Sequence, residues 1–290
     1  MADFLQFAAS GLTVGAVYAL VALGFTLIYN ASGVINFAQG EFVMLGGMAT
    51  VFGAAAGFPL PVAALLAVAL AVAAGLMLDR FAIRPARHAS PIVLIIITIG
   101  AAFVIRGLAQ IFFDKEFHKL PGFSGDDPVR IGGAAILPQT FWILAGTAAI
   151  LSVLWWFMTR TMPGKALRAT AVNRLAADLV GIDTRKVNTL AFAVSAGIGA
   201  AAGILITPIT LTNYDVGTML ALKGFVASVL GGMGNPIGAV AGGLLLGLIE
   251  AFGAGYISSN YKDAAAIVVL LLLLFVRPTG LFGSRSAERV

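Results

Sequence analysis

Long apolar segments constrain this chain more than any other feature of its sequence. A helix needs about 20 apolar residues to cross the ~30 Å hydrocarbon core of a bilayer. Because lipid offers the backbone no hydrogen bonds, helices are the expected spanning elements. The pattern predicts an all-α polytopic membrane protein with about eight or nine transmembrane helices, forming a single domain over residues 1–290. The apolar segments cover residues 8–29, 36–57, 60–78, 90–113, 134–158, 187–211, 217–233, 236–257 and 262–276.

Composition agrees with this fold class and excludes several functions. Hydrophobic residues make up 60% of the chain and charged residues 11%, too few to give a large soluble helical core its polar faces. The absence of cysteine excludes disulfides, thiolate metal sites and cysteine nucleophiles. The net charge of +5 comes from bases beside the apolar segments. We therefore expect the lipid bilayer as a partner and no nucleic acid.

The basic connections predict an orientation in the membrane. Residues 79–89, 159–186 and the tail after 276 are basic, whereas 114–133 mixes both signs. By the positive-inside rule the basic connections are cytoplasmic, which places the N-terminus outside and the C-terminus inside after nine crossings. Eight crossings remain the alternative, because 217–233 is short, contains Lys223 and could be re-entrant. The bases are Arg80, Arg84, Arg87, Arg160, Lys165, Arg168, Arg174, Arg185, Lys186, Arg277, Arg285 and Arg289.

The longest cytoplasmic connection predicts an amphipathic helix. Pro163 and Gly164 end the preceding span, and Gly181 is a suitable stop for the next helix. Between them an apolar stripe of helical period predicts one helix over Lys165–Gly181, parallel to the membrane. Such a helix could rest on anionic lipid or dock into a groove on a soluble partner. The stripe comprises Leu167, Ala171, Leu175 and Leu179, flanked by Val172, Ala176 and Val180.

The stretch YNASGVINFAQGEFVMLGG, residues 29–47, combines polar side chains with glycines between two apolar segments. The apolar run 42–57 has only 16 residues, which is short for a full crossing. We therefore expect 34–39 to enter the membrane as a broken or re-entrant helix with flexible ends at Gly33 and Gly40. Asn36, Gln39 and Glu41 would then line the inner part of a path or a subunit seam. A plain cytoplasmic loop is the alternative.

Three ionisable residues, Arg106, Lys223 and Glu250, fall within apolar segments, all in the outer half. Such residues are functional-site hypotheses. Lys223 and Glu250 are expected to pair, while Arg106 or Lys223 attracts the carboxylate of a passing ligand. In the alternative, Arg106 reaches the outer interface and the other two form a structural ion pair.

Small residues at four-residue spacing predict close helix contacts, either at a subunit interface or within one bundle. No internal repeat is evident by eye. The stripes are Gly11 and Gly15; Ala191, Ser195, Gly199 and Gly203; Gly238 and Gly242; and Gly243 and Gly247.

Three blocks carry a resemblance to a known family. RATAVNRLAADLVGID is similar to the cytoplasmic coupling loop of ATP-binding-cassette importer permeases. GLTVGAVYALVALGFTLIYNASGVINFAQGEFVMLGG and LKGFVASVLGGMGNPIGAVAGGLLLGLIEAF resemble LivH-type branched-chain amino acid permeases, of the branched-chain amino acid and ribose permease superfamily. The three blocks occur along the chain in the family's order.

The resemblance implies a bacterial inner-membrane importer subunit for branched-chain or other hydrophobic amino acids. Its implied partners are cytoplasmic ATPases, a second, LivM-like permease and a periplasmic substrate-binding protein. No glutamate precedes Ala176–Ala177, where the family's classical loop has one, so individual contacts do not transfer. The residues that the coupling loop assigns to ATPase docking are Arg168, Asn173, Arg174, Ala176, Ala177, Gly181 and Ile182.

Catalysis by this chain is not expected. No phosphate-binding G-x-x-x-x-G-K-[ST] loop occurs, so ATP would be used by partner subunits, and no cofactor is expected on this chain. His88 and His118 have no metal-ligand spacing. Related permeases for urea or short amides, and an ion-coupled secondary transporter with broken helices, remain alternatives.

Overall fold

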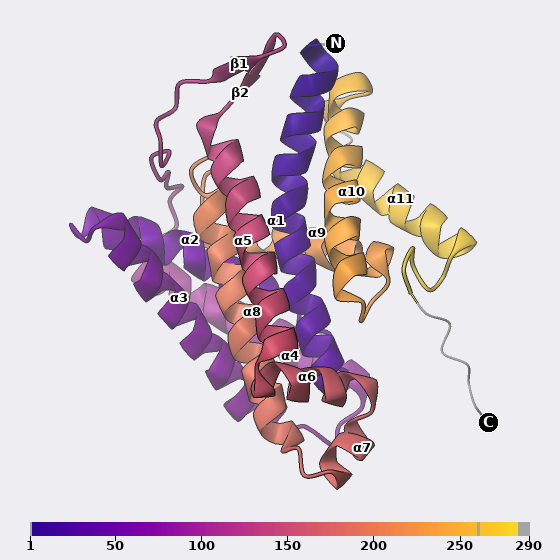
Figure 1. Cartoon of the computed structure of the whole chain (residues 1–290). Helices are drawn as coiled ribbons and strands as arrows, with labels where there is room; N and C mark the ends of the chain where they lie inside the picture. The colour runs from indigo at the N-terminus through magenta and orange to yellow at the C-terminus, as the bar shows by residue number, and fades with distance from the viewer. Residues whose placement is uncertain (1, 260–261, 284–290) are drawn as a thin grey trace.

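The structure, a computed structural model, describes residues 2–259 and 262–283 as a helical bundle (Figure 1). Each apolar segment contributes one helix, so the all-α polytopic prediction is confirmed. The long helices are α1 (Ala2–Ser32), α2 (Gln39–Ala55), α3 (Leu60–Met77), α4 (Pro91–Phe112), α5 (Pro138–Arg160), α8 (Thr184–Ile206), α9 (Val216–Gly231), α10 (Pro236–Tyr256) and α11 (Lys262–Val276). The short elements are π-helix η1 (Leu78–Ile83), strands β1 (Val129–Ile131) and β2 (Ala134–Ile136), and helices α6 (Met162–Val172) and α7 (Arg174–Leu179).

Length and hydropathy distinguish candidate spans from shorter apolar helices. Among the described residues, α1, α3 with η1, α4, α5, α8 and α10 are long and apolar enough to cross a membrane. Helix α9 and the Ile267–Val276 part of α11 are apolar but shorter. Two predicted boundaries differ clearly from the structure. The segment expected from residue 134 begins as β2, which pairs with β1 in an antiparallel hairpin, and the segment expected to reach residue 211 ends its helix at Ile206. Helix α5 starts only at Pro138, a residue well suited to the first helical turn.

Helix α1 is the centre of the bundle, with α5 and α8 on one side and α10 on the other (Figure 1). From Ala16 to Ile28 every side chain is buried, which is the pattern of a helix apolar on all faces. Its glycines let α10 approach closely: a Cβ on Gly247 would lie 2.3 Å from the Gly15 Cα. The small-residue stripes of α1 and α10 therefore pack against each other within one chain, as the bundle alternative predicted.

The chain between α1 and α2 returns into the bundle as irregular backbone, which confirms the expected break. Residues 33–38 are not helical, and α2 begins at Gln39. The Gln39 Nε2 donates to the Ser195 carbonyl (3.2 Å) at the middle of α8. The first helical turn of α2 therefore starts near mid-depth, and α2 continues toward the end of the bundle where the N-terminus lies.

Helices α8 and α9 repeat this arrangement in the opposite direction, although the sequence shows no evident repeat. An irregular segment, 207–215, follows α8 and leads back to α9, which runs toward the end that carries α6 and α7. The two helices meet near their first turns, at Gly40 and Gly217: a Cβ on Gly40 would lie 1.9 Å from the Gly217 carbonyl oxygen. Among the described residues, the stretches 33–55 and 207–231 therefore each combine a short irregular segment with a helix of 17 or 16 residues.

The two ends of the bundle differ in what they carry. The hairpin lies beside the N-terminus, held by Gln6, whose Nε2 donates to the Ala135 carbonyl (3.0 Å). Helices α6 and α7 lie across the opposite end (Figure 1). The last described residues return toward that end, since the Phe282 N–H donates to the Gly231 carbonyl (3.0 Å). The predicted basic residues Arg285 and Arg289 lie outside the described ranges.

Candidate functional site

The connection after α5 forms two short helices, so the single continuous helix predicted over Lys165–Gly181 is wrong. Helices α6 and α7 are separated at Asn173, which has extended backbone (φ −157°, ψ 106°). Its side-chain oxygen accepts from the Ala176 N–H (3.0 Å) and caps α7. Asparagine favours caps over helix interiors because its short polar side chain competes for backbone hydrogen bonds. Pro163 and Gly164 do not end the preceding span as predicted, because α5 already ends at Arg160 and both residues lie in the first turn of α6. The predicted stop agrees with the structure, since Gly181 has φ +89°.

The break also divides the apolar stripe that the sequence predicted. Leu167 of α6 is fully buried against the bundle, whereas the apolar residues around α7 point outward. Val172, Leu175, Leu179 and Val180 are exposed by 88%, 76%, 85% and 76%. We call these four residues the α7 apolar face. An exposed apolar cluster of this kind at one end of a bundle is typical of an interaction surface.

The turn after α7 is tightly fixed. The Ile182 N–H donates to the Ala177 carbonyl (3.0 Å) and the Gly181 N–H to the Asp178 carbonyl (3.0 Å), the two bonds of a Schellman motif. Asp183 then caps α8 by accepting from the backbone N–H groups of Arg185 (3.1 Å) and Lys186 (3.3 Å). The hydrogen bond from Lys186 is the main reason why the pKa of Asp183 lies below its usual range. The α7 apolar face is therefore presented by a rigid turn.

At the centre of the bundle, the re-entrant segment buries three polar side chains. Asn36 and Gln39 are fully buried and Glu41 is 1% exposed. The Ser195 hydroxyl donates to Gln39 Oε1 (2.7 Å), and the Phe37 N–H donates to the Thr98 hydroxyl of α4 (3.1 Å). Asn36 Nδ2 and Glu41 Oε2 are buried without a hydrogen-bond partner. Irregular backbone and unpaired polar atoms at membrane depth are costly unless protein groups or a water-filled cavity surround them.

Arg106 joins this segment to the irregular chain before α9. Its guanidinium lies 2.7 Å from Glu41 Oε1 and 3.1 Å from Asp215 Oδ1, and it also donates to the Thr218 hydroxyl. The Arg106 side chain is only 16% exposed, so protein groups surround most of it. Asp215 is 56% exposed, so this cluster runs from a buried carboxylate to an accessible one.

These contacts also correct the predicted depth of Glu41. The sequence placed Glu41 at the inner mouth and Arg106 in the outer half, yet the two side chains form an ion pair. The irregular segment 33–38 leads the chain away from the end of α1 and back into the bundle before α2 starts. Glu41, in the first turn of α2, therefore lies at the same depth as Arg106. Polar side chains and broken backbone thus meet near mid-depth rather than at the turn between α1 and α2.

A second ion pair lies between α9 and α10. Lys223 Nζ is 2.9 Å from Glu250 Oε1, so the predicted pairing is present. The Tyr18 hydroxyl of α1 donates to Glu250 Oε2 (2.8 Å). Lys223 and Glu250 are 12% and 7% exposed. This pair fixes α1, α9 and α10 to one another; a role in transport stays a prediction.

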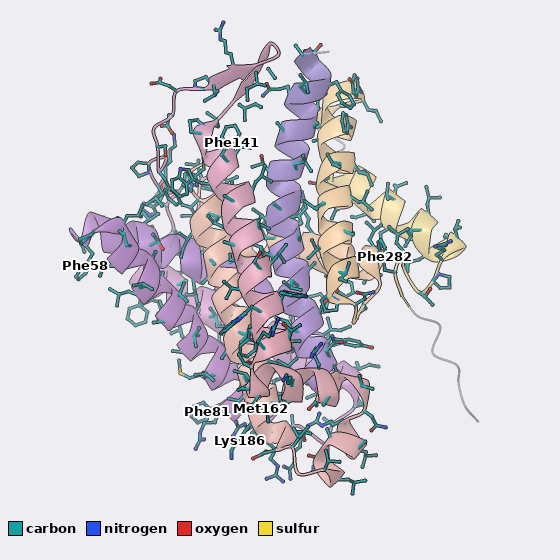
Figure 2. The ribbon with its side chains drawn as sticks, in the orientation of Figure 1. Phe58, Phe81, Phe141, Met162, Lys186 and Phe282 are labelled. Carbon is teal, nitrogen blue, oxygen red and sulfur yellow. The ribbon has the colours of Figure 1, made fainter. Side chains whose placement is uncertain are left out.

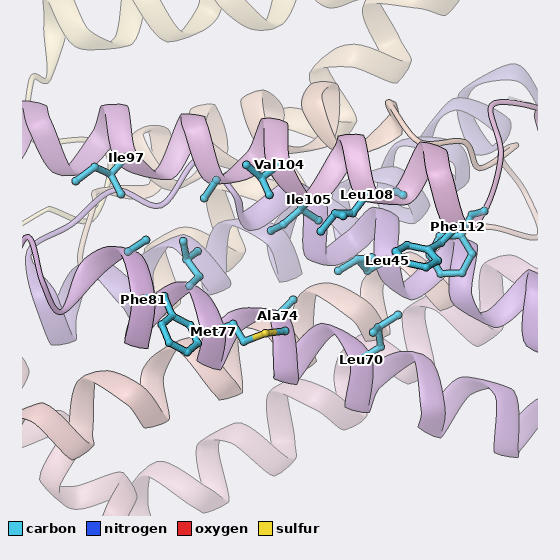
Figure 3. Close-up of a pocket in the computed structure, with 15 residues that line it drawn as sticks. Leu45, Leu70, Ala74, Met77, Phe81, Ile97, Val104, Ile105, Leu108 and Phe112 are labelled. Atoms are coloured by element: carbon cyan, nitrogen blue, oxygen red, sulfur yellow. The ribbon is translucent and has the colours of Figure 1, made fainter.

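An apolar groove of about 810 Å³ lies between α3 and α4 (Figure 3). Leu70 and Met77 of α3 face Val104 and Leu108 of α4, and Leu45 of α2 also borders the groove. All of its lining residues are apolar, so the groove offers nothing to hold the charges of a polar ligand. Its walls are suited to lipid chains or to another apolar surface.

Sequence reasoning missed several members of the buried clusters. Asp215 lies in the connection before α9 and Thr218 in the first turn of α9, and neither position looks unusual in the sequence. Tyr18 and Ser195 lie within runs of apolar or small residues. Only Asp215 carried a signal, because it stands next to the short segment suspected of re-entrance. Over residues 2–259 and 262–283, no group of three or more histidine, cysteine, aspartate or glutamate side chains could hold a metal ion.

Comparison with known proteins gives consistent matches over the whole chain. The family model described as "Branched-chain amino acid transport system / permease component" matches residues 7–277. The chain is 33% identical to the high-affinity branched-chain amino acid transport system permease protein LivH of Escherichia coli strain K12, over 99% of this chain and 98% of that protein. It is 34% identical to BraD of Pseudomonas aeruginosa, described in the same words, with the same coverage of both chains.

More distant matches extend the likeness to other permeases. The ribose import permease protein RbsC of Escherichia coli strain K12 is 25% identical over 90% of this chain and 82% of that protein. Among solved structures, PsaBC from Streptococcus pneumoniae in complex with Fab has a TM-score of 0.52, at 14% identity, and covers 95% of this chain and 92% of that chain. At that identity the structural match supports the fold alone.

Proposed function

The chain belongs to the family of branched-chain amino acid transport permease components of ATP-binding-cassette importers, and on that premise we propose how its parts divide the work. It is a multi-pass membrane transport subunit rather than an enzyme. The proposed cargo is a branched-chain or similar hydrophobic amino acid, as in the relatives LivH and BraD. The exposed α7 apolar face is the single observation that supports its mode of action most directly.

We assign the α7 apolar face to docking of a cytoplasmic ATPase. Four large apolar side chains exposed to this extent would be unfavourable in water, and a groove on a partner protein would remove them from it. Because the Gly181 turn and the Asn173 cap are rigid, a movement of the partner would be transmitted to α8 rather than absorbed by a flexible connection. In this proposal Arg168, Arg174, Ala176, Ala177 and Ile182 surround the contact.

Orientation follows from the same assignment. With the ATPase at the α6–α7 end, the N-terminus is periplasmic and the tail after α11 is cytoplasmic, in agreement with the positive-inside pattern. ATP is bound by the partner subunits, and this chain holds no cofactor of its own. A periplasmic binding protein delivers the cargo near the hairpin end, and a LivM-like chain completes the membrane portion.

We place the inner lining of the path at the two broken crossings. An amino acid carries one carboxylate and one ammonium group, and the cluster of Arg106, Glu41 and Asp215 offers both signs within one hydrogen-bond distance of each other. Asn36, Gln39 and the backbone at Gly40 are adjacent. Lys223 and Glu250 form the second charged position. Weak, multiple contacts of this kind allow entry without trapping the cargo.

The docking proposal is tested by replacing Leu175 and Leu179 with glutamine in the full complex. Loss of ATPase co-purification and of leucine uptake is expected, while helical content and membrane insertion are kept. A matched control is Leu5→Gln, because Leu5 is an exposed leucine (40%) at the opposite end of the bundle. Full retention of the ATPase by the double variant would overturn the assignment of this face.

A further inference from the structure

A second pocket, of about 310 Å³, lies at the α6–α7 end and is strongly basic. Four arginines and a histidine line it, and the rest of the lining is neutral, with no aspartate or glutamate. The basic residues come from three separate parts of the chain: the connection after η1, helix α7 and the first turn of α8. They are Arg84, Arg87, His88, Arg174 and Arg185.

Most of this positive charge is not compensated by the protein. Arg84 pairs with the buried Asp79 (2.9 Å), and that carboxylate is already shared with Asn188, whose Nδ2 donates to it (2.6 Å). Arg87, Arg174 and Arg185 form no ion pair with any residue in the ranges 2–259 and 262–283. Guanidinium groups gathered around one cavity repel each other unless an anion lies between them.

The carboxylates nearest in sequence are occupied elsewhere. Asp178 accepts from the Thr184 hydroxyl (2.8 Å), and Asp183 caps α8 and pairs with Lys186 (3.4 Å). Among the described residues, Arg87, Arg174 and Arg185 therefore have no counter-ion, and an anion from outside would balance their charge. Arginine's planar fork matches phosphate oxygens particularly well, because two N–H groups can donate in parallel.

The position of the pocket relates it to the membrane. It opens where two apolar spans end, since Ile83 closes the span Leu60–Ile83 and Leu94 lies in the first turn of α4. Phe81 and Ile92, beside these two residues, are 71% and 70% exposed. Figure 2 shows Phe81 on the outside of the bundle at the same end as Lys186 and Met162. Apolar side chains and arginines thus meet at the level of lipid headgroups.

We propose that this pocket binds the phosphate of an anionic phospholipid from the adjacent leaflet, with the acyl chains against Phe81 and Ile92. The bound headgroup would tie the α3–α4 connection to α7 and α8, and so hold the α7 turn in place. An acidic side chain of a partner protein is less favoured because the large apolar side chains that a partner would cover lie on the α7 apolar face instead. This site does not depend on the identity of the transported cargo.

The test measures lipid binding to the purified full-length chain in neutral detergent by native mass spectrometry, with phosphatidylglycerol and phosphatidylcholine as probes. The variant Arg87→Gln/Arg174→Gln/Arg185→Gln removes the three unpaired charges. A matched control, Arg80→Gln/Arg160→Gln/Lys165→Gln, removes three exposed charges that do not line the pocket. Each basic residue near an anionic headgroup contributes about five-fold in affinity. The pocket variant is therefore expected to bind phosphatidylglycerol on the order of 100-fold more weakly, and the control within about three-fold of the parent.

Three other results would overturn the proposal. Equal loss in both triple variants would mean that only net charge matters. If millimolar inorganic phosphate displaced phosphatidylglycerol, and phosphatidylglycerol and phosphatidylcholine bound with equal affinity, the ligand would be free phosphate rather than a lipid headgroup. Unchanged phosphatidylglycerol binding in the pocket variant would show that these arginines do not hold the headgroup. An Arg→Lys triple variant at positions 87, 174 and 185, which keeps the charge, checks folding and should retain most of the affinity.

Discussion

Replacing Arg106 with glutamine is expected to destabilise the protein strongly, because it isolates the buried carboxylate of Glu41. Glu41 is 1% exposed, and its Oε1 lies 2.7 Å from the Arg106 guanidinium. Breaking a buried ion pair by removing one partner typically costs about 3–5 kcal/mol, because the remaining charge is uncompensated. The contact between Arg106 and Asp215 adds little, since Asp215 is 56% exposed and water replaces its partner.

The double variant Glu41→Gln/Arg106→Gln separates this effect from simple loss of packing. With both charges removed, the remaining cost is that of two amides with imperfect hydrogen bonds, about 1–3 kcal/mol. The two single variants and the double variant then form a cycle with a coupling free energy of about 2 kcal/mol or more. The cycle is measured by reversible unfolding in mixed micelles, and leucine uptake is recorded for each variant.

A coupling free energy below about 0.5 kcal/mol would refute this reasoning. It would mean that Glu41 is uncharged in the folded protein or that another cation takes the place of Arg106. A variant that keeps the positive charge, Arg106→Lys, provides the matched control. It should retain most of the stability but lose the fork that reaches Glu41 and Asp215 together.

Four further predictions concern other parts of the bundle. Gly40→Ala should lower the free energy of unfolding by about 1–3 kcal/mol, because the added Cβ would lie 1.9 Å from the Gly217 carbonyl oxygen. The control Gly100→Ala places its Cβ in open space on α4 and should be neutral or slightly stabilising in the same unfolding assay. Asn173→Ala should destabilise α7 by about 1 kcal/mol and raise the rate of its backbone hydrogen exchange, whereas Asn173→Asp keeps the cap. Equal exchange rates in the two variants would contradict the capping role. Lys223→Met should be more harmful than Lys223→Met/Glu250→Gln, since only the single variant leaves a buried carboxylate without its cation, and thermal unfolding of both variants decides this. The pKa of Asp183 is lowered by its helix-capping hydrogen bonds, so its contribution to stability is complete above the usual aspartate pKa and is lost as the pH falls through the lowered value; Asp183→Asn should be insensitive to pH in that window.

Hydropathy alone predicted the fold class and most helix positions, because spanning helices obey a single strong constraint. The break after Ser32 was also predictable, since the apolar run 42–57 is too short for a crossing. The pairing of Lys223 with Glu250 followed from their similar depth. Each of these predictions rests on the length of an apolar segment or on the depth of a residue within it. None of them required knowledge of the neighbouring helices.

Tertiary contacts that join distant parts of the chain were beyond this reasoning. The partner of Glu41 is Arg106, which the sequence placed at another level, and the depth error came from the unknown path of the irregular segment. The continuous helix expected over Lys165–Gly181 failed for a local reason, because periodicity does not show that Asn173 will act as a cap. The repeated arrangement of α1–α2 and α8–α9 is visible only in space, since different residues build the two halves.

The burial of Gln39 and Glu41 has a consequence for biosynthesis. Gln39 bonds to Ser195, 156 residues later in the chain, and Glu41 needs Arg106 of α4 and lies beside Gly217 of α9. When α2 leaves the ribosome none of these groups exists, and an unpaired carboxylate is costly within lipid. We therefore expect α2 to settle in the bundle only after α4, α8 and α9 have been made. On this reasoning the helices would reach their final depth in an order that differs from their order in the chain.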